Sequence, residues 1–208
     1  MLLVPLVLSL SFHEWAHAWS ASKLGDDTAE RMGRLTLNPL AHIDLIGTIA
    51  LPLLGVPFGW AKPVPVDPTR FRRSVKMGTG MALTAAAGPI SNLVLATVCA
   101  AIFGVLARFS PDLILPGQGV RRLLLLMIQL NVTLALFNLI PLPPLDGSRI
   151  VDAFVPVRLR AGWEQFARIA PFVLLAIVFL PGGFVGRILA GPSGVVLSLL
   201  QRLVNAIV

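Results

Sequence analysis

Residues 2–22 read LLVPLVLSLSFHEWAHAWSAS, an apolar run interrupted by the polar cluster His13-Glu14 and by His17. About 20 residues of α-helix cross the hydrocarbon core of a bilayer, so we expect a membrane-embedded helix here. The run has no basic region at its start and no small-residue cleavage site, which favours a retained span over a signal peptide. His13 and His17 are four residues apart and therefore share one face of that helix.

The composition of the whole chain indicates a membrane protein. Of its 208 residues 56% are hydrophobic and 13% are charged, and the mean hydropathy is +0.83. A soluble domain of this size needs more polar surface. The formal net charge of +7 comes from basic residues between apolar runs, without a basic-aromatic stripe, so we expect no nucleic-acid partner. The one cysteine, Cys99, lies in an apolar run and is expected to be a packing residue.

Further apolar segments predict spanning helices over residues 81–107, 121–140, 163–180 and 184–208. Residues 34–66 combine a short alternating stretch with many Gly and Pro residues, which a regular spanning helix would not tolerate. We expect a small membrane-associated β or re-entrant element there. The predicted fold is an all-α polytopic membrane bundle of about five transmembrane helices, in a single domain over residues 1–208.

The loops between these segments predict an orientation. Residues 23–41, 61–76 and 149–160 carry several basic side chains, whereas residues 109–119 carry none. Cytoplasmic loops are enriched in Lys and Arg, so we expect the three basic loops in the cytoplasm. His17 then lies toward the cytoplasmic end of the first span. The sequence does not fix an oligomeric state.

The segment from His13 to His17 forms an H-E-x-x-H motif, in which both imidazoles can reach one metal ion. Zn²⁺ takes His nitrogens and, in catalytic sites, keeps one position for water. The metal lowers the pKa of that water to about 7, and Glu14 would accept its proton and deliver it to a leaving amine. The motif therefore predicts one zinc ion per chain. The alternative is polar adhesion between helices, which more often uses Ser, Thr or Asn and needs no such spacing.

A catalytic zinc takes three protein ligands, and the third ligand is not local. Lys23 occupies the place of a third histidine in one soluble pattern. Glu30 lies in a polar loop and Glu164 at the start of a span. Asp146 directly follows a span and is the better candidate, although a helix N-cap explains an aspartate there equally well.

Several stretches resemble the site-2 protease family of intramembrane zinc metalloproteases. The matching stretches are residues 13–18, 38–44 with 47–48, 58–66, 87–92, 138–141 and 145–147. They follow the order of that family and extend over about residues 8–152. No PDZ-like or CBS-like domain accompanies them, so the resemblance is to a minimal form of the family.

The resemblance implies that Asp146 is the third zinc ligand and that Glu14 is the catalytic base. It implies that Asn92 binds substrate or stabilises an oxyanion, with helix packing as the alternative role. It also implies that residues 43–66 help to admit and unwind a substrate helix. His42 could be a polar contact near that region, or a surface or capping histidine.

The sequence thus predicts a zinc-dependent endopeptidase that cleaves in or near transmembrane segments of other proteins. Its expected partners are the lipid bilayer and a transmembrane protein substrate. The expected location is a prokaryotic plasma membrane, with the active site toward the cytoplasm. A non-catalytic scaffold or pseudo-protease of the same fold is the alternative, and the presence of His13, Glu14, His17 and Asp146 argues against it. A transporter is less favoured, because the other spans carry few charges.

Overall fold

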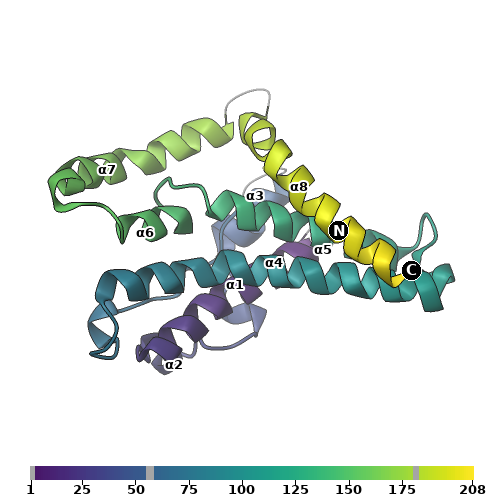
Figure 1. The fold of residues 1–208 in the computed structure, drawn as a ribbon, viewed down its shortest axis with the longest axis horizontal. Coiled ribbons are helices and arrows are strands. Elements are labelled where there is room, and N and C mark those ends of the chain that lie inside the picture. Colours follow the sequence, from purple (N-terminus) through teal and green to yellow (C-terminus); the bar gives the residue numbers. More distant parts are fainter. Residues whose placement is uncertain (1–2, 55–58, 180–182) are drawn as a thin grey trace.

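The computed structural model describes residues 3–54, 59–179 and 183–208, and its regular structure is helical (Figure 1). The long helices are α1 (Leu3–Leu24), α4 (Met77–Phe109), α5 (Gly119–Asn138), α7 (Val157–Phe179) and α8 (Phe184–Ile207). The short elements are α2 (Thr28–Arg31), α3 (Leu51–Leu53), α6 (Asp146–Asp152), a π-helical turn (Leu45–Ala50) and the 3₁₀ turns Pro39–Ala41, Pro68–Arg70 and Pro111–Ile114. The expected all-α polytopic bundle is confirmed. Leu2, Leu180 and residues 55–58 of the expected elements lie outside the described residues.

Four described helices, α4, α5, α7 and α8, are long and apolar enough to cross a membrane. This length and composition identify an integral membrane protein. Helix α1 has 22 residues, which at 1.5 Å each gives about 33 Å, but the polar cluster from His13 to His17 sets it apart from those four. Its role as a fifth span stays a prediction.

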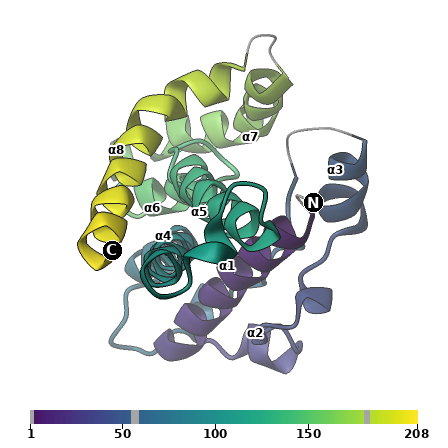
Figure 2. The same ribbon diagram turned by 90° about the vertical axis from the view of Figure 1, so that its right-hand side faces the viewer.

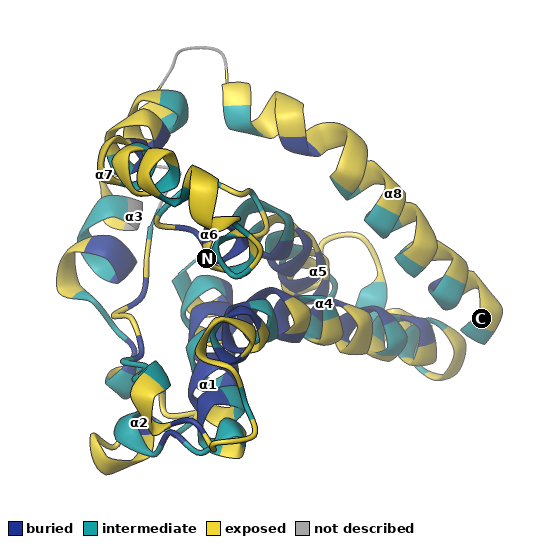
Figure 3. Cartoon of the chain, turned by 60° about the vertical axis from the view of Figure 1, so that its left-hand side comes forward, coloured by how far each residue is buried: buried dark blue, intermediate teal, exposed yellow. Residues whose placement is uncertain are grey.

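Helix α4 is the centre of the bundle and packs against α1, α5, α6 and α8 (Figure 2). Its buried positions are mostly small residues, and these let neighbouring helices approach closely. Cys99 is buried on α4 in an apolar cluster with residues of α5 and α8, as expected for a packing residue. Figure 3 shows that buried residues concentrate on α1, α4 and α5, whereas α7 and α8 are largely exposed. The apolar outer faces of α7 and α8 are suited to contact lipid.

Of the expected β or re-entrant element, the β form is wrong for the described part of residues 34–66, which contains no strand, and the re-entrant form stays a prediction. The physical reason is local capping. The Asn38 carboxamide accepts a hydrogen bond from the amide of Leu40 at the start of a 3₁₀ turn. The Asp44 carboxylate accepts hydrogen bonds from the amides of Ile46 and Gly47 at the start of a π-helical turn. Gly and Pro in this stretch therefore mark short helical turns between loops.

Residues 60–67 form an extended segment whose backbone groups make separate hydrogen bonds to several different residues. The amide of Lys62 donates to the carbonyl of His42, and the Arg34 guanidinium donates to the carbonyls of Lys62 and Pro63. The amide of Asp67 donates to the buried carboxylate of Asp26, just after α1. These hydrogen bonds take the place of the regular backbone hydrogen bonds between paired strands. They hold the segment beside the end of α1.

Replacing Asp26 with Ala should destabilise the fold by about 3 kcal/mol, because its carboxylate accepts hydrogen bonds from the Asp67 amide and from the Thr28 amide and hydroxyl. The control is Asp27→Ala, which removes a partly exposed carboxylate paired with Arg31 and Arg70 and should change stability little, because exposed ion pairs contribute little. Thermal unfolding of both variants in detergent measures the difference. Equal unfolding midpoints would show that Asp26 does not hold the extended segment.

Candidate metal centre

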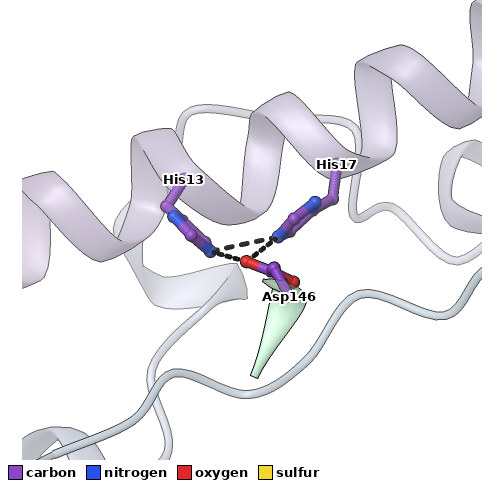
Figure 4. Close-up of side chains that lie close together, drawn as sticks. All are labelled: His13, His17 and Asp146. Carbon is purple, nitrogen blue, oxygen red and sulfur yellow. Dashed lines mark hydrogen bonds and ion pairs between the residues drawn. The ribbon is translucent and has the colours of Figure 1, made fainter. Parts of the chain in front are cut away.

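His13 and His17 lie one turn apart on the buried face of α1, and their Nε2 atoms are 3.0 Å apart. Asp146, the first residue of α6, comes from a segment far away in the sequence. Its Oδ2 atom lies 3.1 Å from Nε2 of His13 and 3.4 Å from Nε2 of His17 (Figure 4). The structure thus brings together the three residues that were expected to hold a metal.

Tight packing of the preceding turn positions Asp146. Prolines end α5, and the chain turns back so that an added Cβ at Gly147 would overlap the carbonyl oxygens of Leu139 and Ile140. Only glycine fits this close approach. The N-cap of α6 is Leu145, and no side chain caps the helix, so the N-cap explanation for Asp146 is wrong. The Asp146 side chain is left facing the two histidines.

The second nitrogen of each imidazole is engaged elsewhere, and this determines which nitrogen carries the proton. Nδ1 of His17 lies 2.7 Å from the backbone carbonyl of Thr84, and Nδ1 of His13 lies 2.6 Å from the carboxamide oxygen of Asn92. A carbonyl oxygen only accepts hydrogen bonds, so each neutral imidazole carries its proton on Nδ1. Both Nε2 atoms therefore present lone pairs toward Asp146.

The result is a buried cluster of three acceptor atoms with no donor among them. His13, His17 and Asp146 are 5%, 9% and 8% exposed, and Oδ2 of Asp146 is buried without a hydrogen-bond partner. With both imidazoles neutral, such a cluster is repulsive unless a metal cation sits between the atoms. A tetrahedral zinc with bonds of about 2.0–2.1 Å holds its ligands roughly 3.3 Å apart, close to the separations observed here. The donor set and its geometry fit zinc.

Glu14 is half-buried and next to His13 on α1, but it does not join the three converging atoms. Its Oε2 accepts the backbone amide proton of Val64 at 2.9 Å. The extended segment of residues 60–67 therefore holds the carboxylate beside the metal centre. A sequence motif cannot reveal this contact, because the two residues are 50 positions apart.

Asn92 is fully buried on α4, on the far side of His13 from the three acceptor atoms. Its amide nitrogen donates to the carboxamide oxygen of Asn131 at 2.7 Å and, at 3.4 Å, to the carbonyl of Ser9. These contacts support a role in orienting His13. The expected role in substrate or oxyanion binding stays a prediction, and these contacts do not support it.

The other candidate residues lie elsewhere. Glu30 is exposed on α2 and Glu164 is exposed on α7. His42 is buried and its Nε2 donates to the carbonyl of Thr36, so it holds the loop after α2 together.

Sequence reasoning missed two contributors, the carbonyl of Thr84 and the amide of Asn131. Asn131 lies inside an expected span, and a buried amide in such a span is a signal that could have drawn attention to it.

Fold and site together define a class, a helical membrane protein whose buried histidine pair and aspartate are suited to bind a metal. The family model for peptidase family M50 matches residues 113–181. A Bacillus subtilis protein named "Putative zinc metalloprotease YwhC" is 40% identical over 183 residues, which are 88% of this chain and 81% of that protein. The chain belongs to peptidase family M50, and the resemblance to site-2 proteases is confirmed.

More distant relatives are mycobacterial. A protein of Mycobacterium tuberculosis named "Putative zinc metalloprotease Rip2" is 29% identical over 189 residues, covering 89% of this chain and 70% of that protein. The protein of the same name in Mycolicibacterium smegmatis is 32% identical over 142 residues, covering 68% and 52%. No solved structure matches the chain.

Gly88 lies against the two imidazoles, and its replacement by Ala should impair metal binding. An added Cβ would lie 2.5 Å from Nε2 of His17 and 2.6 Å from Cε1 of His13, so both rings would have to move. We expect zinc affinity to fall by at least about tenfold, the lower end of the effects of disturbing ligand orientation. A competition titration with a chelator measures this affinity.

The matched control is Gly78→Ala on the same helix, where the nearest atom to an added Cβ is Cα of Ala153 at 3.7 Å. This variant should bind zinc like the wild type, since the contact is an ordinary one. Wild-type affinity in Gly88→Ala would contradict the geometry described here.

Proposed function

We propose that the protein is a zinc-dependent intramembrane endopeptidase, in which His13, His17 and Asp146 hold the metal. One observation carries this proposal. Three buried acceptor atoms converge, and the two imidazoles among them carry their protons on Nδ1, which faces away from the point of convergence. The relatives named zinc metalloproteases support zinc as the ion. When bound, zinc supplies a Lewis acid that makes hydroxide available near neutral pH and polarises a peptide carbonyl.

Glu14 is the general base of this proposal. Its carboxylate takes a proton from the attacking water and later delivers that proton to the leaving amine. The hydrogen bond from the Val64 amide fixes one carboxylate oxygen and leaves the other with unused lone pairs. The extended segment therefore orients the base, and it also limits how far the carboxylate can turn away from the metal centre.

The substrate of this proposal is a transmembrane segment of another protein. The metal centre lies among α1, α4 and α6 of a membrane protein, and a peptide bond reaches it from within or near the bilayer. A substrate helix must unwind locally first, because its own hydrogen bonds engage its carbonyls. Within residues 43–66, Val64 contacts Glu14, and this contact supports the idea that the region receives such a segment.

Location and domain structure follow from the same proposal. Residues 1–208 form one catalytic domain, and the Arg- and Lys-rich loops around residues 23–41 and 61–76 lie in the cytoplasm. These loops adjoin the end of α1 that carries His17, so the metal centre opens toward the cytoplasm. The bacterial relatives support a prokaryotic plasma membrane.

Glu14→Gln should abolish cleavage and keep zinc. The amide preserves size but cannot take a proton, and general acid–base catalysis contributes about 10²–10⁴-fold to rate. Wild type and variant are purified in detergent without a polyhistidine tag. Zinc content and cleavage of a tagged single-span membrane protein, with Gly and Pro near the cytoplasmic end of its span, are measured on both.

The matched control is Glu30→Gln, which neutralises an exposed glutamate on α2 and should leave both quantities unchanged. Equal cleavage by Glu14→Gln and wild type would refute the role of Glu14. A wild type that holds no zinc would refute the metalloprotease itself. A wild type that holds zinc but cleaves no single-span protein of a varied panel would favour the non-catalytic scaffold.

A further inference from the structure

A chain of buried amides joins α5 to the metal centre across α4. Asn131 on α5, Asn92 on α4 and Ser9 on α1 are all completely buried. Two carboxamides inside an apolar bundle are costly unless every polar atom has a partner. Here each polar atom of both carboxamides is hydrogen-bonded, and the bonds lead from one helix to the next.

A backbone carbonyl determines which end of each carboxamide in this series of hydrogen bonds donates and which end accepts. The amide nitrogen of Asn131 lies 2.8 Å from the carbonyl of Met127 and 2.8 Å from Oγ of Ser9. The carbonyl of Met127 accepts and cannot donate, so only the NH₂ group of Asn131 can face it. The carboxamide oxygen of Asn131 must then face Asn92.

The orientation of Asn131 in turn determines the orientation of Asn92 and the proton position on His13. Because an oxygen of Asn131 faces Asn92, Asn92 must present its NH₂ group there and its oxygen to Nδ1 of His13. An oxygen at that place requires a proton on Nδ1, which leaves the lone pair on Nε2. The position of the proton on His13 is therefore fixed three hydrogen bonds away.

We propose that Asn131 is a positioning residue that fixes the tautomer of His13 through Asn92. The inference deepens the proposed function and rests on it for the identity of the metal, but the tautomer itself does not depend on a metal. Without the oxygen of Asn131, the long 3.4 Å hydrogen bond to the carbonyl of Ser9 alone holds the NH₂ group of Asn92, and the carboxamide can rotate and present that group to His13. The imidazole then shifts its proton to Nε2, the atom that faces Asp146, and the metal position is blocked.

His17 provides the contrast within the same site. Its Nδ1 proton is accepted directly by the carbonyl of Thr84, a backbone atom that cannot rotate as a carboxamide can. His17 therefore needs no second residue to keep its tautomer. Only His13 depends on a side chain whose two ends can be exchanged. The shorter of the two hydrogen bonds that the NH₂ group of this side chain donates goes to Asn131, at 2.7 Å against 3.4 Å for the carbonyl of Ser9.

Two variants of nearly equal size separate orientation from packing. Asn131→Leu removes the acceptor that faces Asn92. Asn131→Asp keeps an acceptor there in either protonation state, and the hydroxyl of Ser9 can donate to it. If Asn131 were only a packing residue, the buried carboxylate would do more damage than the leucine. Tautomer control predicts the opposite order.

The chain has only three histidines, so ¹⁵N labelling of histidine gives three imidazoles to assign. In the metal-free wild type in detergent, we expect His13 to show a protonated Nδ1 and an unprotonated Nε2. Asn131→Leu should lose this single tautomer, whereas Asn131→Asp should keep it. His17 should be unchanged in both variants.

Zinc affinity, from competition with a chelator, is the second readout. It should fall by about tenfold in Asn131→Leu and stay within about threefold of wild type in Asn131→Asp, in line with the 10–100-fold effects of groups that orient ligands. Circular dichroism and size-exclusion chromatography establish that each variant is folded. Should Asn131→Leu fail to fold, Asn131→Ala removes the same acceptor without adding apolar bulk.

A retained Nδ1 tautomer together with unchanged zinc affinity in folded Asn131→Leu or Asn131→Ala would overturn the proposal. A greater loss in Asn131→Asp than in Asn131→Leu would overturn it as well. If the wild type binds no zinc, the proposed function fails, and the tautomers of the metal-free protein still test the role of Asn131 separately.

Discussion

The mutual repulsion of three lone-pair atoms, enclosed in an apolar bundle, is the constraint on which the rest of this structure depends. Nε2 of His13, Nε2 of His17 and Oδ2 of Asp146 lie within 3.4 Å of one another with no proton donor among them. A cation removes the repulsion, and the protein must hold the three atoms in place for it. That requirement explains why helices from both halves of the chain meet around α4, where small residues permit close contact.

What the sequence could predict was local. His13 and His17 were identified because the two residues are one helical turn apart, and periodicity is the property that a single sequence displays most directly. Asp146 is 129 positions from His17, and reasoning from the residues left it beside an N-cap explanation. The resemblance to a family selected Asp146, and the contacts of α6 exclude the N-cap. The distance between distant segments depends on packing, which a pattern along the chain does not contain.

The loop over residues 34–66 and the role of Asn92 show one physical limit of reasoning from sequence. A β or re-entrant element was expected because residues 34–66 contain a short alternating stretch and many Gly and Pro residues. In place of strands, Asn38 and Asp44 cap short helical turns. For Asn92 the resemblance implies substrate or oxyanion binding, with helix packing as the alternative. That role stays a prediction, and in the structure the carboxamide is bonded to His13 and Asn131. In each case a carboxamide or carboxylate could bond to several partners, and only the three-dimensional neighbours decide which partner it takes.

The buried polar side chains of α1, α4 and α5 lie where they can hydrogen-bond to one another. The helices α7 and α8 expose apolar side chains over most of their length and bury few residues, whereas α1, α4 and α5 enclose histidine, asparagine and serine. A buried carboxamide is tolerated only when both its ends are bonded, and full bonding makes it directional. The carbonyl of Met127 starts the chain of bonds, and each following group has one permitted orientation. The same bonds that make Asn92 and Asn131 tolerable in an apolar bundle therefore also determine the proton position on His13, so that stability and ligand geometry arise from one set of contacts.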